Sequence, residues 1–157
     1  MALILNLNVH PTLSTSLRLT HDKARTEFSR AAQGEGPLAQ AAKRAVLIYL
    51  PHFGREEQTI LPVLDLVPDL AQGALKPEWA GLLPLISEFT ARHDPRSIED
   101  EWVLSAAEEL QRVAHREKNQ EFVELAYSLK EHERIEHEVA YPAVMVIGNY
   151  LRAHLGA

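Results

Sequence analysis

The chain has 157 residues, a formal net charge of -6 and eight histidines but no cysteine. The lack of cysteine excludes disulfides, iron–sulfur clusters, thiolate zinc sites and cysteine nucleophiles, so any metal must be bound through nitrogen and oxygen atoms. The acidic balance disfavours a nucleic-acid surface, and no apolar run approaches the roughly 20 residues that span a bilayer. We therefore expect one cytoplasmic domain, residues 1–157, that has neither nucleic acid nor membrane as a partner.

Apolar residues recur at helical spacing from about Thr12 to Gln33, and this pattern predicts a first helix. The glycines and the proline of segment 34–37 suit the end of one helix and the first turn of the next. A second helix is predicted from about Pro37 to Leu66. Because this segment contains Pro51 and Gly54, we expect a kink or an irregular turn near its middle.

The segment from Val67 to Lys76 is predicted to be a loop, since it contains a proline and a glycine. A third helical region follows from about Pro77 to Arg116, and Pro95 is expected to divide it into two pieces.

The last helix is predicted to follow residues 117–119 and to extend to about His154, with an interruption at Pro142. No segment of the sequence shows the alternation of β-branched and polar residues that predicts a strand. Long helices joined by short loops favour an all-α fold, an antiparallel up-down four-helix bundle.

One motif occurs twice in the sequence. The segment 52–62 contains His52, Glu56 and Pro62, and the segment 132–142 has histidine, glutamate and proline at the same offsets, 80 residues later. The residues between these positions differ. Duplication of a helical hairpin would leave such a trace.

The spacing of this motif has a chemical meaning. Positions i and i+4 of a helix lie on one face, only about 40° apart around the axis, so a histidine and a glutamate so placed can bind one centre. His52 with Glu56, and His132 with Glu136, would then supply two imidazoles and two carboxylates. Such carboxylates can bridge two metal ions about 3.5–4 Å apart. These donors suit iron, manganese or zinc, and a carboxylate-bridged pair favours iron or manganese.

Two further histidines can complete the ligand set, one from each remaining helical region. The turn at 34–37 lies nearly midway between His21 and His52, so an antiparallel hairpin brings these two to the same level. His93 is the corresponding candidate before His132, although the turn at 117–119 is poorly centred between them.

Glu57 and His137 are secondary candidates for metal ligands, because each lies five residues after a motif histidine and about 140° away around the helix. The alternative for each His–Glu pair is an ordinary ion pair on a solvated helix face. Because the two His–Glu pairs have the same spacing and are followed by a proline at the same offset, we favour metal binding over that alternative.

The two motifs resemble the signature segments of the hemerythrin-like HHE cation-binding domain family, and the resemblance covers about residues 15–150. It implies a four-helix bundle that holds two non-haem iron ions, with manganese or zinc less favoured. It further implies that Glu56 and Glu136 are bridging ligands. The remaining ligands that it implies are the four histidines His21, His52, His93 and His132.

The sequence departs from the oxygen-carrying members of that family at two positions. They have a second histidine four residues after the one that His93 matches, where this chain has Ser97. They have a carboxylate where this chain has His137. The ligand set is instead similar to that of iron-centre repair proteins, which usually carry a cysteine-containing N-terminal segment that this sequence does not contain.

The resemblance implies two classes of function. One is a binding protein whose iron pair binds or reacts with dioxygen or nitric oxide in redox sensing, storage or iron handling. The other is an enzyme of nitrosative or oxidative stress, which reduces nitric oxide or peroxide or repairs iron centres. A third, weaker alternative is a zinc-loaded or empty site that serves a partner protein. Because the sequence has no flavin or nucleotide fingerprint, turnover would require an external electron donor.

Overall fold

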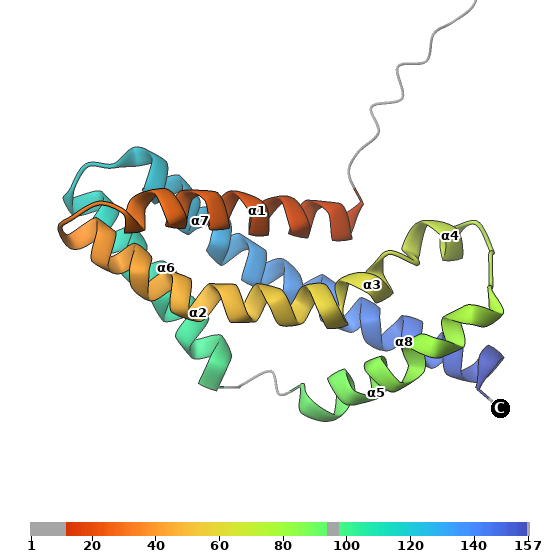
Figure 1. Ribbon diagram of the computed structural model, residues 1–157. Coiled ribbons are helices and arrows are strands. Elements are labelled where there is room, and N and C mark those ends of the chain that lie inside the picture. The colour runs from red at the N-terminus through yellow and green to blue at the C-terminus, as the bar shows by residue number, and fades with distance from the viewer. Residues whose placement is uncertain (1–11, 94–97, 157) are drawn as a thin grey trace, which may run out of the picture.

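The computed structural model describes residues 12–93 and 98–156, and within these ranges the chain is helical and contains no strand. The all-α class predicted from the sequence is confirmed (Figure 1). Pro95 and Ser97 lie outside the described residues. The elements in chain order are α1 (Leu13–Ala32), α2 (Pro37–Thr59), α3 (Leu61–Leu64), α4 (Val67–Ala71), η1 (Pro77–Leu82), α5 (Leu83–Arg92), α6 (Ile98–Arg116), α7 (Gln120–Ile135), η2 (Glu136–Ala140) and α8 (Tyr141–Leu155).

Four of the longer helices pack around one apolar core. Helix α1 contacts α2 and α7, and α6 contacts the same two helices, so the four close a ring. The largest fully buried side chains inside this ring are aromatic and leucine residues. They are Phe28, Tyr49, Phe53, Leu110, Leu125 and Leu129.

A second apolar core lies toward the C-terminal end of the molecule. Helices α5 and α8 run side by side there, with α3 and η1 beside α8 (Figure 1). Gly148 permits the close approach of α5 and α8, because a Cβ atom at this position would overlap the buried side chain of Ile86. This core includes Ile60 and Tyr141, which lie at the boundary between the two cores.

The first two helices predicted from the sequence are present, but several details of the first half of the chain differ from the prediction. The first helix runs from Leu13 to Ala32, and the Thr12 side chain caps it by accepting a hydrogen bond from a backbone N–H. The irregular turn predicted as one possibility at Pro51 and Gly54 is wrong, since α2 is helical throughout, and a kink there stays a prediction. Pro51 and Leu47, whose carbonyl loses its helical partner, are both exposed, so water can replace the missing bond.

The breaks occur instead just ahead of the two motif prolines. The helix predicted to extend to Leu66 ends at Thr59, and α3 begins at Leu61 with Pro62 in its first turn. The interruption predicted at Pro142 occurs at residues 136–140, which form a π-helical turn, and Pro142 lies in the first turn of α8. A proline ring clashes with the carbonyl four residues before it, so the backbone hydrogen bonds of the helix are disturbed in the turn that precedes the proline.

The predicted loop at 67–76 also requires a correction, because its first part is the short helix α4. Pro68, which suggested a loop, lies in the first turn of that helix, where its missing N–H has no helical partner to lose.

Candidate metal centre

Six polar side chains meet between the two apolar cores, and all six are buried. We call them the buried cluster. Helix α1 contributes one of them, α2 two, α7 two, and the first residue of the π-helical turn η2 contributes the last. The members are His21, His52, Glu56, His132, Glu133 and Glu136.

Four members form one group of converging donor atoms, namely His21, Glu56, His132 and Glu136. The Nε2 atoms of His21 and His132 are 3.1 Å apart. His21 Nε2 is 3.2 Å from Glu56 Oε2, and His132 Nε2 is 2.8 Å from Glu136 Oε1. Ligands bound at about 2.0–2.1 Å around one metal ion are separated by roughly 3.0–3.4 Å, depending on the angle between them. The observed separations are close to that range.

His52, Glu133 and Glu136 form a second group. His52 Nε2 lies 3.4 Å from Glu133 Oε1 and 3.7 Å from Glu136 Oε2. It also lies 3.1 Å from Glu56 Oε1. Glu136, which belongs to both groups, therefore turns one oxygen toward each of them, and Glu56 of the first group turns its second oxygen toward His52. Such placements suit bridging ligands.

Most of these donor atoms have no hydrogen bond of good geometry within the described part of the chain. This applies to Nε2 of His52, Oε2 of Glu56, Oε1 of Glu133 and both carboxylate oxygens of Glu136. A buried polar atom without a partner costs about 1–3 kcal/mol, and more when the group is charged. Cations held by the two groups would supply the missing partners, so the donor set fits metal ions.

Burial and mutual interaction shift the pKa values of the carboxyl groups and imidazoles in the buried cluster. Burial, together with the nearby Glu56 carboxylate, raises the pKa of Glu136 to about 7 against the opposing pull of His132 and His52. Burial lowers the pKa of His132, but the adjacent carboxylates of Glu136 and Glu56 outweigh it and raise that pKa to about 10. For Glu56, burial is outweighed by the nearby imidazoles of His52, His132 and His21, so its pKa is well below the usual value. One carboxyl group thus tends to keep a proton while the other stays ionised.

In two of the three imidazoles of the buried cluster, the Nδ1 atom contacts a further carboxylate that is itself paired with an arginine. His21 Nδ1 lies 2.9 Å from Glu57, which binds Arg25 through both of its oxygens at 2.7 and 2.9 Å. His52 Nδ1 lies 3.4 Å from Glu99, and Glu99 also pairs with Arg55. A carboxylate at Nδ1 fixes the tautomer and turns the Nε2 lone pair toward a metal, as is usual around metal-bound histidines.

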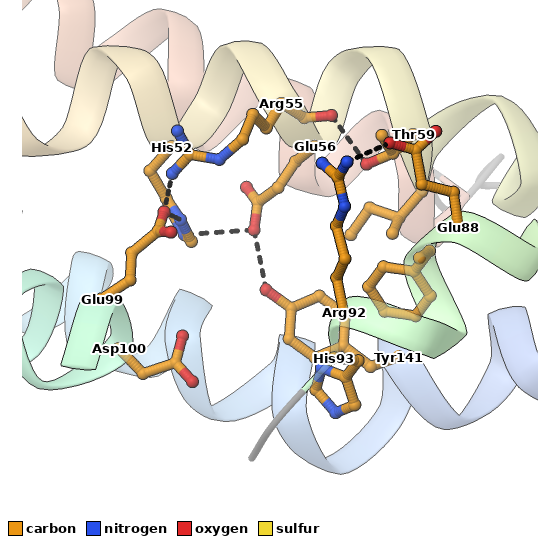
Figure 2. A pocket seen from close by; sticks show the side chains of 12 residues that line it. His52, Arg55, Glu56, Thr59, Glu88, Arg92, His93, Glu99, Asp100 and Tyr141 are labelled. Carbon is orange, nitrogen blue, oxygen red and sulfur yellow. Dashed lines mark hydrogen bonds and ion pairs between the residues drawn. The ribbon is translucent and has the colours of Figure 1, made fainter. Parts of the chain in front are cut away.

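A cavity of about 300 Å³ lies beside the cluster, between α2, α5, α6 and the start of α8. We call it the side cavity. Figure 2 shows His52, Glu56 and Tyr141 along its inner wall, where the Tyr141 hydroxyl donates a 2.9 Å hydrogen bond to Glu56 Oε1. The rest of the lining is mixed. It comprises Ile60 and Phe89 with Arg55, Thr59, Glu88, Arg92, His93, Glu99 and Asp100.

The structure brings together five of the six metal ligands predicted from the sequence, namely His21, His52, Glu56, His132 and Glu136. His93 is in neither group. It ends α5 at the edge of the side cavity, with its ring against Phe89 and Tyr141. A ligand role for His93 stays a prediction.

The two secondary candidates also lie outside the groups. Glu57 contacts the cluster through His21 Nδ1. His137 lies 3.8 Å from Asp100, and its ring packs beside His93 and Tyr141. Their direct ligation of a metal stays a prediction as well.

The sequence interpretation missed Glu133 and Tyr141. Glu133 had a usable signal, since it precedes Glu136 by three residues and such positions share a helix face. Tyr141 had none. It follows Glu136 by five residues, which is about 140° around a regular α-helix, and only the wider π-helical turn at 136–140 brings it onto the same side.

We expect Glu57→Gln to weaken metal binding by roughly 10–100-fold, which is the usual effect of losing such an outer partner. The amide would bind Arg25 less well and would orient His21 less firmly. Competition with a coloured chelator measures the change in affinity. Asp22→Ala is the matched control, because Asp22 is exposed and pairs with the same Arg25 at 3.5 Å. Equal affinities for the two variants would contradict an orienting role of Glu57.

The chain matches no known family model, no curated protein and no solved structure. Among the described residues, no helix is both long enough and apolar enough to cross a membrane.

Proposed function

We propose that the protein is a hemerythrin-like metal protein that holds two non-haem iron ions in the buried cluster. One observation carries this proposal. The two oxygens of Glu136 face different imidazoles, with Oε1 2.8 Å from His132 Nε2 and Oε2 3.7 Å from His52 Nε2. A carboxylate so placed suits a bridge between two cations.

The donor types narrow the metal to a few candidates, and the resemblance of the two motifs to hemerythrin-like domains favours iron among them. Imidazole with carboxylate suits iron, manganese and zinc, and bridged pairs favour iron or manganese. In the proposed arrangement, α1, α2, α6 and α7 correspond to a four-helix bundle. That assignment agrees with the ring of contacts that these helices make around one core.

When bound, the iron pair would supply one-electron chemistry toward dioxygen or nitric oxide. The chain's own contribution is to hold the donors, to orient His21 and His52 through Glu57 and Glu99, and to keep water from the buried side of the cluster. We propose redox sensing, storage or iron handling as the use of this chemistry.

An enzyme that reduces nitric oxide or peroxide, or repairs iron centres, is the second candidate. The side cavity favours it, because a cavity beside the three-donor group gives small molecules access to the site. An external electron donor would be required for turnover.

We expect the diferrous protein to be oxidised irreversibly by air, because three of the six cluster residues are carboxylates and anionic donors favour the ferric state. The test is stopped-flow mixing of anaerobic, iron(II)-loaded protein with oxygen, followed by removal of oxygen under vacuum. The expected product is a stable diferric form. Full recovery of the diferrous state through repeated cycles would contradict this prediction and favour an oxygen carrier.

A further inference from the structure

The two donor groups of the buried cluster are not equivalent. The first contains two imidazoles, His21 and His132, whereas the second contains only His52 among its three residues. Metal sites with fewer protein donors keep positions open for an external ligand. Of the three imidazoles, only His52 lines the side cavity. A metal ion held beside His52 would therefore be the one that a ligand in the side cavity can reach.

The side cavity is larger than a diatomic ligand requires. Its volume is about 300 Å³, whereas one water molecule takes up about 30 Å³ of liquid. Cavities of this size are at the lower end of those that hold small organic molecules. Ile60 and Phe89 add apolar surface to the lining, and the Phe89 ring centroid lies 5.4 Å from that of Tyr141. The polar inner wall is formed by His52, Glu56 and the Tyr141 hydroxyl (Figure 2).

The arginines at the rim of the cavity are already paired. Arg55 pairs with Glu99, and Arg92 lies 3.0 Å from Glu88 (Figure 2). The rim therefore offers little attraction to a multiply charged anion. A ligand with one anionic group would instead be neutralised by the metal at the inner end, and a carboxylate is a preferred donor for iron.

We propose that the side cavity binds a small monocarboxylic acid, whose carboxylate ligates the metal ion beside His52 and whose apolar part packs against Ile60 and Phe89. This inference rests on the proposed function, since it requires metal in the cluster. It assigns to the site a substrate or effector larger than dioxygen or nitric oxide.

Benzoate is the probe, and calorimetric titration of the anaerobic, iron(II)-loaded protein measures its binding. We expect binding that is lost in the metal-free protein and that is weaker by at least about tenfold for benzyl alcohol, which has the same apolar part but no carboxylate. Equal binding of benzyl alcohol, or benzoate binding without metal, would overturn the proposal.

Thr59→Trp tests the location, because Thr59 lines the cavity and is only partly buried. The indole should fill the cavity and weaken benzoate binding by at least about tenfold. Gln58→Trp is the matched control, since Gln58 is the exposed neighbour and does not line the cavity. If Thr59→Trp does not fold, Phe89→Ala provides the same test by removing apolar surface from the lining. Unchanged benzoate affinity in the folded variant would overturn the proposal.

Nitric oxide separates a failure of this inference from a failure of the proposed function. It is small enough to reach the metal past a tryptophan, so its binding, followed by electron paramagnetic resonance, should persist in Thr59→Trp. Nitric oxide binding without benzoate binding in the unaltered protein would overturn the monocarboxylate site and leave the iron centre in place. Loss of both responses, with no iron bound, would overturn both proposals.

Discussion

Glu136→Ala is expected to remove at least one of the two metal ions. Glu136 is the only residue common to both donor groups, and its two oxygens face His132 and His52. Without this bridge, two cations would repel each other across the cluster with less negative charge between them. Metal analysis of the purified variant, together with circular dichroism to show that it is folded, measures the effect.

Glu138→Ala is the matched control for this variant, because Glu138 lies two residues away but is exposed and pairs with Arg134 at the surface. It should keep the full metal content. Glu56→Ala should behave like Glu136→Ala, since Glu56 also turns one oxygen toward each group. Unchanged metal content in both cluster variants would show that these carboxylates are not bridges.

Metal removal is expected to lower the melting temperature by roughly 5–10 °C. A ligand that binds only the native state stabilises it by about 2.7 kcal/mol at a hundredfold excess over its Kd. Each kcal/mol corresponds to roughly 2–4 °C for a protein of this size. The physical cause is the set of buried, unpartnered donor atoms, which a metal would satisfy.

Calorimetric melting of metal-free and iron-loaded protein at equal protein concentration measures this difference. Adding chelator to the Glu136→Ala variant is the control, because its melting temperature should fall by less than that of the unaltered protein when it holds fewer metal ions. Identical melting of the two forms of the unaltered protein would mean that the buried cluster does not bind metal in the native state.

The part of the site that could be predicted from the sequence depends on local geometry. His52 with Glu56, and His132 with Glu136, share a face at a spacing of four residues on any helix, and the structure buries both pairs in one cluster. His21 was placed by the short turn at 34–37, whose position the structure confirms.

The rest depends on where helices break, which local spacing does not determine. His93 was paired with His132 although the turn at 117–119 is poorly centred between them. The structure places His93 directly after the end of α5, at the edge of the side cavity. Tyr141 reaches Glu56 only because residues 136–140 form a wider turn. Pro142 indicated that the helix would be interrupted. The interruption lies in the turn before it, because the proline ring clashes with a carbonyl of that turn.

The most direct test of the central claim is the number and identity of metal ions in aerobically purified protein, measured by elemental analysis and native mass spectrometry. We predict about two iron atoms per chain, because three imidazoles and three carboxylates arranged in two groups exceed the needs of one ion. One zinc ion per chain with no iron would contradict the account.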